Sequence, residues 1–142
     1  MDTAADLTID KLAEGMTFSF DILVTDQIID DFAELSGDRS PIHMDEDFAK
    51  AHGFARRVAH GALINSFISR LVGMHCPGRL AILHSLNVKY HHPTHPGDEI
   101  TVSGIVEHIS ESTKTITLQL MVINKADQAV NAKGKAQVGF LT

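Results

Sequence analysis

The chain has 142 residues, which is enough for one domain with its own core. Hydrophobic residues make up 44% of it and charged residues 21%, a composition typical of globular domains and not of disordered or fibrous chains. The formal net charge of −6 argues against a nucleic-acid partner, because duplex binding needs a concentrated basic face. We therefore expect a single globular domain over residues 1–142.

The N-terminus and the cysteine content indicate a cytoplasmic protein. Residues 1–6 are acidic and lack the charged start and apolar run of a signal peptide, and no apolar stretch approaches membrane-spanning length. The single cysteine, Cys76, cannot form an internal disulfide, so the fold does not depend on an oxidising compartment. We expect Cys76 to be a small buried or half-buried side chain.

The first third of the chain changes from strand periodicity to helix periodicity. Residues 16–24 alternate in hydrophobicity, which predicts a half-buried strand. Thr25 is a suitable N-cap for a helix that Gly37 would end. Asp45 is a suitable cap for a shorter helix that ends near Gly53.

Residues 61–73 carry the strongest helix signal. The apolar residues follow the spacing of one helix face, and the opposite side carries small and polar residues, with Arg70 as the only charge. We therefore predict a core helix whose opposite side is also substantially buried. The apolar face comprises Ile64, Phe67, Ile68, Leu71 and Val72, and the opposite side comprises Ala62, Asn65, Ser66 and Ser69.

Everything after Pro77 alternates as strands do. The alternating segments cover residues 82–90, 100–106, 116–122 and 130–138, separated by polar or glycine-rich breaks. Breaks this short favour antiparallel neighbours. One long buried helix followed by four antiparallel strands predicts an α+β fold in which the sheet curls around the helix.

An acid, Asp38, and an imidazole, His43, lie five residues apart between two predicted helices. Gly37 ends the first helix, and Pro41 disfavours helix at the residue before it, so we predict a stiff, non-helical turn. Such a turn can direct both side chains into one space, as a pair for proton transfer requires. The alternative is a structural turn at Asp38 with a solvent-facing His43.

A second motif, His60-Gly61, leads into the apolar helix. The first amides of a helix are unpaired donors with a partial positive charge, so the Gly61 N–H could bind a developing oxyanion. Glycine also removes the side chain that would block a substrate. The alternative is an ordinary glycine at a helix start, with His60 as a capping or packing group.

Three motifs together resemble the MaoC-like hydratases. Gly37-Asp38-x-x-Pro41-x-His43 resembles the G-D-x-N-P-x-H signature of that family, and His60-Gly61 resembles the head of its central helix. Tyr90-x-x-Pro93-x-x-x-Gly97-Asp98 stands where the family has an aromatic residue, a proline and Gly-Asp between strands. The resemblance covers residues 15–140 and implies a hot-dog fold, in which an antiparallel sheet wraps a long helix, and a homodimer.

The resemblance implies an (R)-specific enoyl-CoA hydratase. Asp38 and His43 would activate a water that attacks the β-carbon, and a proton would reach the α-carbon on the same face. The Gly61 amide would stabilise the enolate-like oxygen. Ser69 matches a serine that supports the site in short single-domain hydratases, although a small residue facing the sheet explains it equally well. Ser40 replaces the asparagine of the motif, so the loop geometry or a contact to water would differ.

Three other functions remain open. An acyl-carrier-protein dehydratase runs the same chemistry backwards and uses the same residues. A thioesterase on the same fold is disfavoured by the spacing of Asp38 and His43, and a non-catalytic acyl-binding subunit by the intact pair.

No metal or cofactor is expected. The nine histidines include His91-His92-x-x-His95, but this spacing matches no strong zinc pattern, and Cys76 lies in another segment. Four cations could meet the phosphates of coenzyme A or of a phosphopantetheine arm, with solvated surface charge as the alternative for each. These cations are Arg56, Arg57, Arg79 and Lys89.

Overall fold

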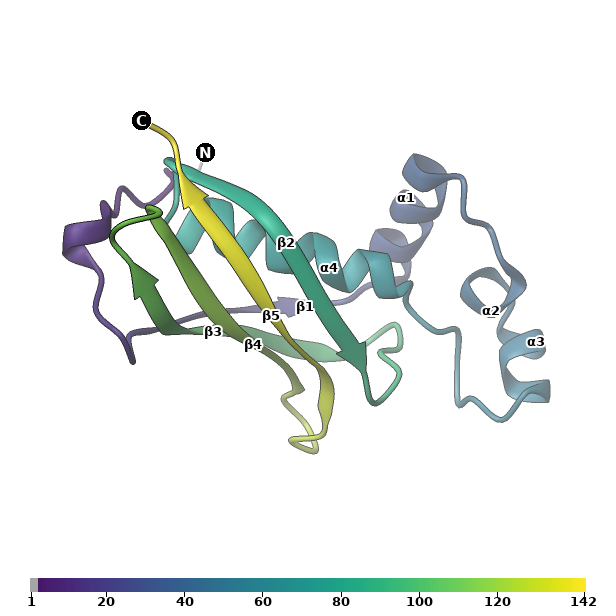
Figure 1. The fold of residues 1–142 in the computed structure, drawn as a ribbon. Coiled ribbons are helices and arrows are strands. Elements are labelled where there is room, and N and C mark those ends of the chain that lie inside the picture. Colours follow the sequence, from purple (N-terminus) through teal and green to yellow (C-terminus); the bar gives the residue numbers. More distant parts are fainter. Residues whose placement is uncertain (1–2) are drawn as a thin grey trace.

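The computed structural model describes residues 3–142 and contains one curved antiparallel sheet, a long helix that the sheet wraps, and shorter helices at one end (Figure 1). Five strands form the sheet within the described residues. The elements, in chain order, are η1 (Ile9–Lys11), β1 (Thr17–Leu23), α1 (Asp26–Ser36), α2 (Pro41–Met44), α3 (Glu46–Ala51), α4 (Gly61–Arg70), η2 (Leu71–His75), β2 (Ala81–Tyr90), β3 (Glu99–Ser110), β4 (Thr115–Asn124) and β5 (Val130–Phe140).

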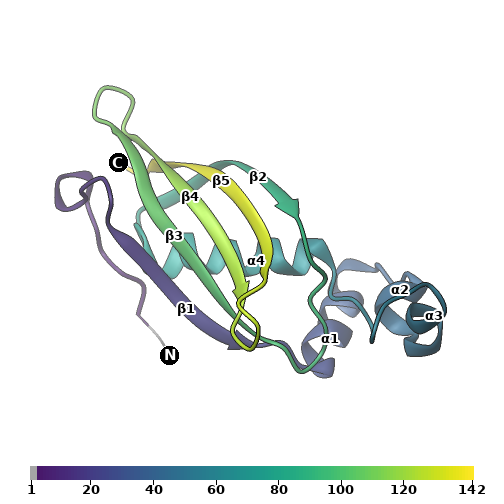
Figure 2. The same cartoon turned by 90° about the horizontal axis from the view of Figure 1, so that it is seen from below.

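The helix α4 lies against the inner face of the sheet, and Figure 2 shows the strands arching over it. Its buried residues belong to one core cluster with inward-facing residues of β3, β4 and β5. Each large apolar side chain buried in this way contributes about 1.5–3 kcal/mol. The predicted helix over residues 61–73 is confirmed, although its last turns widen into η2. The α+β architecture, a sheet around a central helix, is also confirmed. The buried residues of α4 are Leu63, Ile64, Phe67 and Ile68.

The opposite side of α4 is open within a single chain. Ala62, Ser66 and Ser69 are exposed, because the sheet covers only the apolar side of the helix. The prediction that this side is also buried is therefore wrong for one chain. The same observation rules out that Ser69 faces the sheet.

The order of strands in the sheet is β1-β3-β4-β5-β2. The short breaks correctly predict that β3, β4 and β5 are antiparallel neighbours, but β2 and β3 are not paired. The connection 91–98 between them crosses the end of the sheet. At one end the His91 N–H donates to Asn131 O of β5 at 2.8 Å, and at the other the Gly97 N–H donates to Val24 O after β1 at 2.7 Å.

Three predicted helix ends are confirmed. The Thr25 side chain accepts a hydrogen bond from the Ile28 N–H at the start of α1. Gly37 ends that helix with a φ of 78°, a left-handed conformation that glycine adopts without strain. Asp45 caps α3 by accepting from the Phe48 N–H.

The segment that follows Gly37 differs from the prediction in one respect. Ser40 is extended, as expected before a proline, but Pro41–Met44 form a single helical turn, α2, that carries His43. Proline favours the first helical position, because its missing N–H breaks no helix bond there and its φ is already suitable. The prediction of a wholly non-helical turn is therefore wrong.

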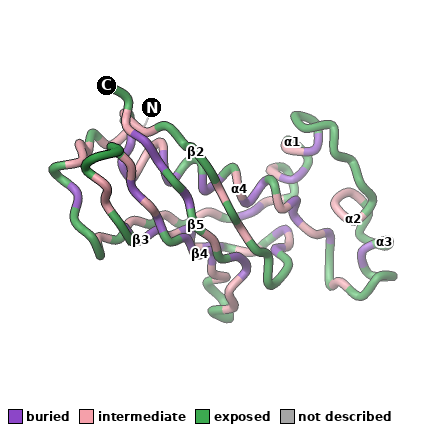
Figure 3. The backbone as a smooth tube through the Cα atoms, in the orientation of Figure 1, coloured by how far each residue is buried: buried purple, intermediate pink, exposed green. Residues whose placement is uncertain are grey.

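Buried residues are concentrated in α4 and in the strands that face it, whereas α2 and α3 lie at one end with few buried residues (Figure 3). Cys76 is 1% exposed, which confirms the predicted buried side chain, and burial raises the pKa of its thiol to about 12. Within residues 3–142 no helix has the length and apolar content needed to cross a membrane. The cytoplasmic location stays a prediction.

Candidate active site

Asp38 and His43 are brought together by the short segment between α1 and α2. The Asp38 carboxylate accepts a hydrogen bond from the Ser40 N–H through Oδ1 at 3.1 Å, and its Oδ2 lies 3.8 Å from His43 Nε2. The Asp38 side chain is 53% exposed and that of His43 is 15% exposed. The bond from the Ser40 N–H is the one expected if Asp38 only stabilised a turn. His43, however, does not face solvent, as that alternative requires. The two side chains share one space, as the paired interpretation predicts.

Hydrogen bonding determines which nitrogen of His43 faces Asp38. His43 Nδ1 lies 2.7 Å from the carbonyl oxygen of Val58, which can only accept, so Nδ1 carries a hydrogen. In the neutral ring Nε2 therefore has a free lone pair beside the Asp38 carboxylate. The Val58 N–H donates in turn to Ile42 O at 3.0 Å, so the chain before α4 braces α2 through two bonds.

Arg57 anchors this bracing segment to the start of α1. Its guanidinium donates to Asp26 and Asp30 at 2.7 Å each and to the carbonyl oxygen of His43 at 3.2 Å. Burial alone would lower the pKa of Arg57, but the hydrogen bonds and charges of the two aspartates outweigh burial and raise it. The Arg57 side chain is 11% exposed. It is a structural anchor and not a cation free for a ligand.

His60 contacts both members of the pair. Its Nε2 donates to the Asp38 carbonyl oxygen at 2.8 Å, and its ring stacks on the His43 ring, with 3.8 Å between centroids and 25° between planes. Phe32 of α1 packs edge-on against the same ring at 4.9 Å. His60 is 2% exposed, and its Nδ1 has no hydrogen-bond partner in the described part of the chain.

The sequence marks His60 only as part of the His60-Gly61 motif. The packing alternative is correct, whereas the capping alternative is wrong, because the side chain makes no cap bond to α4. The contacts with Asp38 and His43 join residues far apart in sequence, and no spacing rule predicts them.

A cavity of about 320 Å³ lies beside His43 and the start of α4. Its lining includes Gly61 and Ile64 of α4, the residues 90–94 and the residues 131–132 of β5. The volume is at the lower end of the range for small-molecule sites. Asp38 is not part of the lining, but its Oδ2 lies 3.8 Å from Nε2 of His43, which is.

Gly61 lies under the ring of Tyr90. A Cβ at position 61 would be 2.9 Å from Tyr90 Cζ, closer than side-chain atoms pack, so this ring position requires glycine. The Tyr90 hydroxyl donates to Asn65 Oδ1 at 2.7 Å, which holds the ring across the first turns of α4. The Gly61 N–H belongs to the first turn of α4, where amides lack an intrahelical acceptor and carry partial positive charge.

Two other residues singled out from the sequence contribute less directly. Ser69 lies eight positions along α4 from Gly61, on the exposed side, and is not part of the cavity lining. Its assigned role stays a prediction. Ser40 gives its N–H to Asp38, and its side chain makes no cap bond to α2. Ser40, which replaces the asparagine of the motif, therefore contacts Asp38 through its backbone N–H.

Asp38, His43 and His60 also form a group that could hold a metal ion, because one ligand atom from each lies within 4.8 Å of the others. One nitrogen of each imidazole is already bonded to a carbonyl oxygen, at Val58 and at Asp38, and these bonds orient the two rings. The histidines at 91, 92 and 95 do not belong to the group. The absence of a metal stays a prediction.

Known proteins with similar sequence include hydratases and dehydratases. The MaoC like domain model matches residues 10–128. An (R)-specific enoyl-CoA hydratase from Rhodospirillum rubrum is 33% identical over 110 residues, which cover 78% of this chain and 76% of that protein. A mitochondrial 3-hydroxyacyl-[acyl-carrier-protein] dehydratase from Arabidopsis thaliana is 37% identical over 79 residues, covering 56% of this chain and 45% of the dehydratase.

The fold matches as well as the sequence. The (R)-hydratase from A. caviae involved in PHA biosynthesis superposes with a TM-score of 0.86 at 29% identity, covering 91% of this chain and 97% of that chain. This likeness confirms the hot-dog fold that the three sequence motifs imply.

Proposed function

Because this chain belongs to the MaoC-like domain family, we propose that it is an (R)-specific enoyl-CoA hydratase, a hydro-lyase that reversibly adds water to trans-2-enoyl thioesters. The observation that carries the proposal is the Asp38 carboxylate 3.8 Å from the free Nε2 of His43, at a cavity that also includes Gly61. The hydratase relative from Rhodospirillum rubrum supports it over 78% of the chain.

Asp38 and His43 hold and activate the attacking water. The 3.8 Å between Oδ2 and Nε2 is too long for a direct hydrogen bond and leaves both atoms available to one water molecule. The water oxygen bonds to the β-carbon while the pair takes a proton, and the pair returns a proton to the α-carbon on the same face. The C=C π bond and one O–H bond of the water are broken, one C–O and one C–H bond are formed, and the product is a (3R)-hydroxyacyl thioester.

The Gly61 N–H is the donor for the thioester oxygen. This oxygen gains negative charge as the α-carbon becomes enolate-like, and a donor at a helix N-terminus adds partial positive charge in the right place. Gly61 and His43 line the same cavity, so one bound thioester can meet both. Oxyanion donors of this kind are typically worth about two to three orders of magnitude in turnover.

A dehydratase acting on an acyl carrier protein is the second candidate, because microscopic reversibility gives it the same residues. The carrier-protein dehydratase from Arabidopsis thaliana matches a smaller share of this chain than the hydratase does, 56% against 78%. We therefore expect a higher kcat/KM for crotonyl-CoA than for the crotonyl thioester of a carrier protein.

Hydration of crotonyl-CoA tests the proposal, because it removes the conjugated enoyl absorbance. We expect turnover with formation of the (3R)-hydroxy product, which chiral chromatography of the hydrolysed product identifies. A thiol reagent in the same reaction detects release of coenzyme A. Thiol release without hydration would instead identify a thioesterase, and the absence of both reactions over a graded series of chain lengths would identify a non-catalytic acyl-binding subunit.

We also propose that the chain is a homodimer with the active sites near the subunit boundary. The edge strand β2 exposes Ile82 and Leu83 by 45% and 36%, and the open side of α4 exposes small residues such as Ala62 and Ser66. Proteins generally cover an unpaired apolar edge strand. Light scattering at micromolar concentration should give twice the chain mass of 15.5 kDa, and the mass of a monomer would contradict the proposal.

A further inference from the structure

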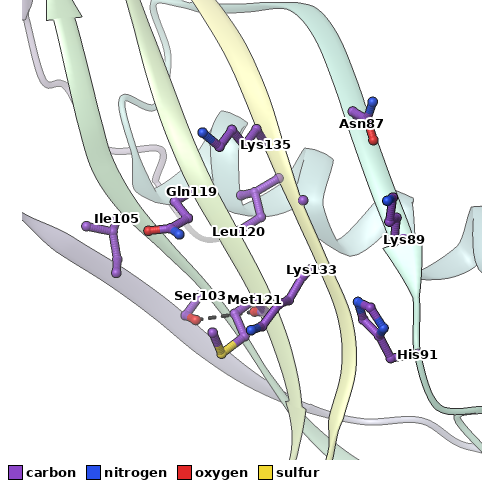
Figure 4. Close-up of a pocket in the computed structure, with 11 residues that line it drawn as sticks. Asn87, Lys89, His91, Ser103, Ile105, Gln119, Leu120, Met121, Lys133 and Lys135 are labelled. Carbon is purple, nitrogen blue, oxygen red and sulfur yellow. Dashed lines mark hydrogen bonds between the residues drawn. The ribbon is translucent and has the colours of Figure 1, made fainter.

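A larger cavity, of about 580 Å³, lies on the outer face of the sheet (Figure 4). In that view its side chains stand in front of the strands, with α4 behind them. We call this surface the outer groove. Two adjacent rows of cross-strand neighbours form it, one running through Lys89, Lys133 and Met121 and the other through Asn87, Lys135 and Gln119.

Lys89 and Lys133 are directly opposite each other in the register of β2 and β5. Side chains in this position have Cβ atoms about 5 Å apart, and like charges there are destabilising. Lys135 has a carboxylate partner, Glu107, at 3.0 Å. In the described part of the chain no carboxylate lies within 4.0 Å of Lys89 or Lys133. Two ammonium groups therefore face one cavity without compensation, in a chain of net charge −6.

Lys89 differs in this respect from Arg56, Arg57 and Arg79, the other three candidate phosphate ligands. Each arginine has a carboxylate partner, so none of the three is a cation that is free for a ligand. Arg56 pairs with Glu46, Arg57 with Asp26 and Asp30, and Arg79 with Asp6.

The outer groove adjoins the candidate active site at His91. This residue lines both the outer groove and the cavity that contains His43 and Gly61. It directly follows Tyr90, whose ring covers Gly61. The linings of the two cavities therefore adjoin at the end of β2.

We propose that the outer groove binds the phosphate-bearing end of coenzyme A while the acyl thioester occupies the cavity at His43. The inference rests on the proposed hydratase function. Lys89 and Lys133 supply two ammonium groups for phosphate oxygens, and an anion between them removes the repulsion of the opposed pair. Ile105, which is 39% exposed, and Met121 supply apolar surface for the adenosine.

Two other occupants fit the outer groove less well. A second copy of this chain, docked face to face, would oppose lysines to lysines. An acidic carrier protein would satisfy the charges, but a concave site of about 580 Å³ has the size of a small-molecule site and not of a flat protein contact.

The decisive variant is the double substitution Lys89→Gln and Lys133→Gln. We expect the KM for crotonyl-CoA to rise roughly five- to tenfold with kcat unchanged. A rise of this size corresponds to the usual contribution of two partly exposed ion pairs to binding. The KM for crotonyl-N-acetylcysteamine, a thioester without phosphates, should not change. Lys114→Gln, on the turn between β3 and β4, is the matched control, and it should leave both KM values unchanged. Equal KM values for wild type and double variant with crotonyl-CoA would overturn the proposal.

Two further measurements separate this inference from the proposed function. Calorimetric binding of adenosine 3′,5′-bisphosphate should weaken by a similar factor in the double variant, and this readout needs no turnover. If the bisphosphate binds through Lys89 and Lys133 but the protein hydrates no enoyl thioester, the proposed binding site in the outer groove is supported and the proposed hydratase function is rejected. A KM effect confined to a crotonyl-carrier-protein substrate would make the groove a protein-docking site and overturn the proposal. The thermal midpoint should be unchanged or raised, because the substitution removes a repulsion.

Discussion

The ring of His60 stacks on the ring of His43 at 3.8 Å, and its Nε2 donates to the backbone carbonyl of Asp38 at 2.8 Å. One buried side chain thus contacts both halves of the proposed catalytic pair, although it is not part of the cavity lining. Groups that react must be held in one geometry, and small misplacements are costly. His60 is therefore expected to act as a positioning residue.

We predict that His60→Phe lowers kcat by roughly ten- to a hundredfold with little change in KM, since the aromatic stack is kept and the bond to Asp38 is lost. The variant should remain folded, because phenylalanine keeps the ring packing against His43 and Phe32 and removes a buried Nδ1 that has no hydrogen-bond partner in the described residues. His52→Phe is the control, since His52 also stacks on an aromatic ring and bonds a carbonyl oxygen, but away from this site. Equal kcat values for the two variants would show that His60 only fills space.

Gly61→Ala should disturb Tyr90 more than the backbone. The new Cβ would lie 2.9 Å from Tyr90 Cζ, so the ring must shift, and we expect this shift to weaken its bond to Asn65. We expect a drop in kcat/KM of about tenfold or more in the Tyr90 background and a much smaller drop when Tyr90→Ala is already present. Double-mutant-cycle kinetics with crotonyl-CoA measure this coupling, and additive effects would contradict it.

Removing metal ions should not change activity. Asp38, His43 and His60 have a spacing that could hold a metal, but the proposed chemistry needs only the carboxylate and the imidazole. We therefore expect unchanged turnover after dialysis against a chelator. Added Zn²⁺ should inhibit the enzyme where it binds the three side chains, because it would then occupy the catalytic pair. Loss of activity with chelator, restored by one metal, would mean that the group is a metal centre.

Arg57→Met should lower the free energy of unfolding by about 1–3 kcal/mol, because it removes hydrogen bonds to Asp26, Asp30 and the carbonyl of His43. The two aspartates are 63% and 47% exposed, so water can replace the guanidinium, and the cost stays below that of a stranded buried charge. Urea denaturation measures the change. Arg79→Met, which breaks an exposed pair, should cost less than about 0.5 kcal/mol.

The parts of the fold that could be predicted are those whose signal is periodic. The core face of α4 recurs at helical spacing, and β3, β4 and β5 alternate over their lengths, so local residues determine both. The turn Pro41–Met44 is too short to show a period, and a proline is equally typical of turns. The position of β2 at the edge depends on where the connection 91–98 is bonded, which only the folded chain determines.

The candidate site also contains residues that local sequence predicts and residues that only the fold brings together. Asp38 and His43 lie within one short segment, so their proximity followed from local sequence. His60 and Arg57 reach this segment from the chain before α4, through contacts with residues 14 to 31 positions away. Such contacts depend on the packing of α1 against that chain, and no pattern in the sequence encodes them.

The proposed catalytic pair makes the sharpest prediction. Asp38→Asn and His43→Ala should each lower turnover by roughly two to four orders of magnitude, the usual worth of positioned acid–base groups. Asp38→Asn keeps the shape of the side chain and removes only its charge and its ability to take a proton. Its control is Asp47→Asn, which changes an exposed carboxylate on the nearby helix α3 and should leave turnover unchanged.

The double variant of Asp38 and His43 separates a catalytic unit from two independent contributions. Both groups are proposed to bind the same water, whose place between Oδ2 and Nε2 spans 3.8 Å. Loss of either group already removes the activated water, so the double variant should be only slightly slower than the slower single variant. Turnover is followed by the loss of crotonyl-CoA absorbance, with circular dichroism to verify folding. If either single variant stays folded and keeps near-native turnover, the pair is structural, and the hydratase proposal fails with it.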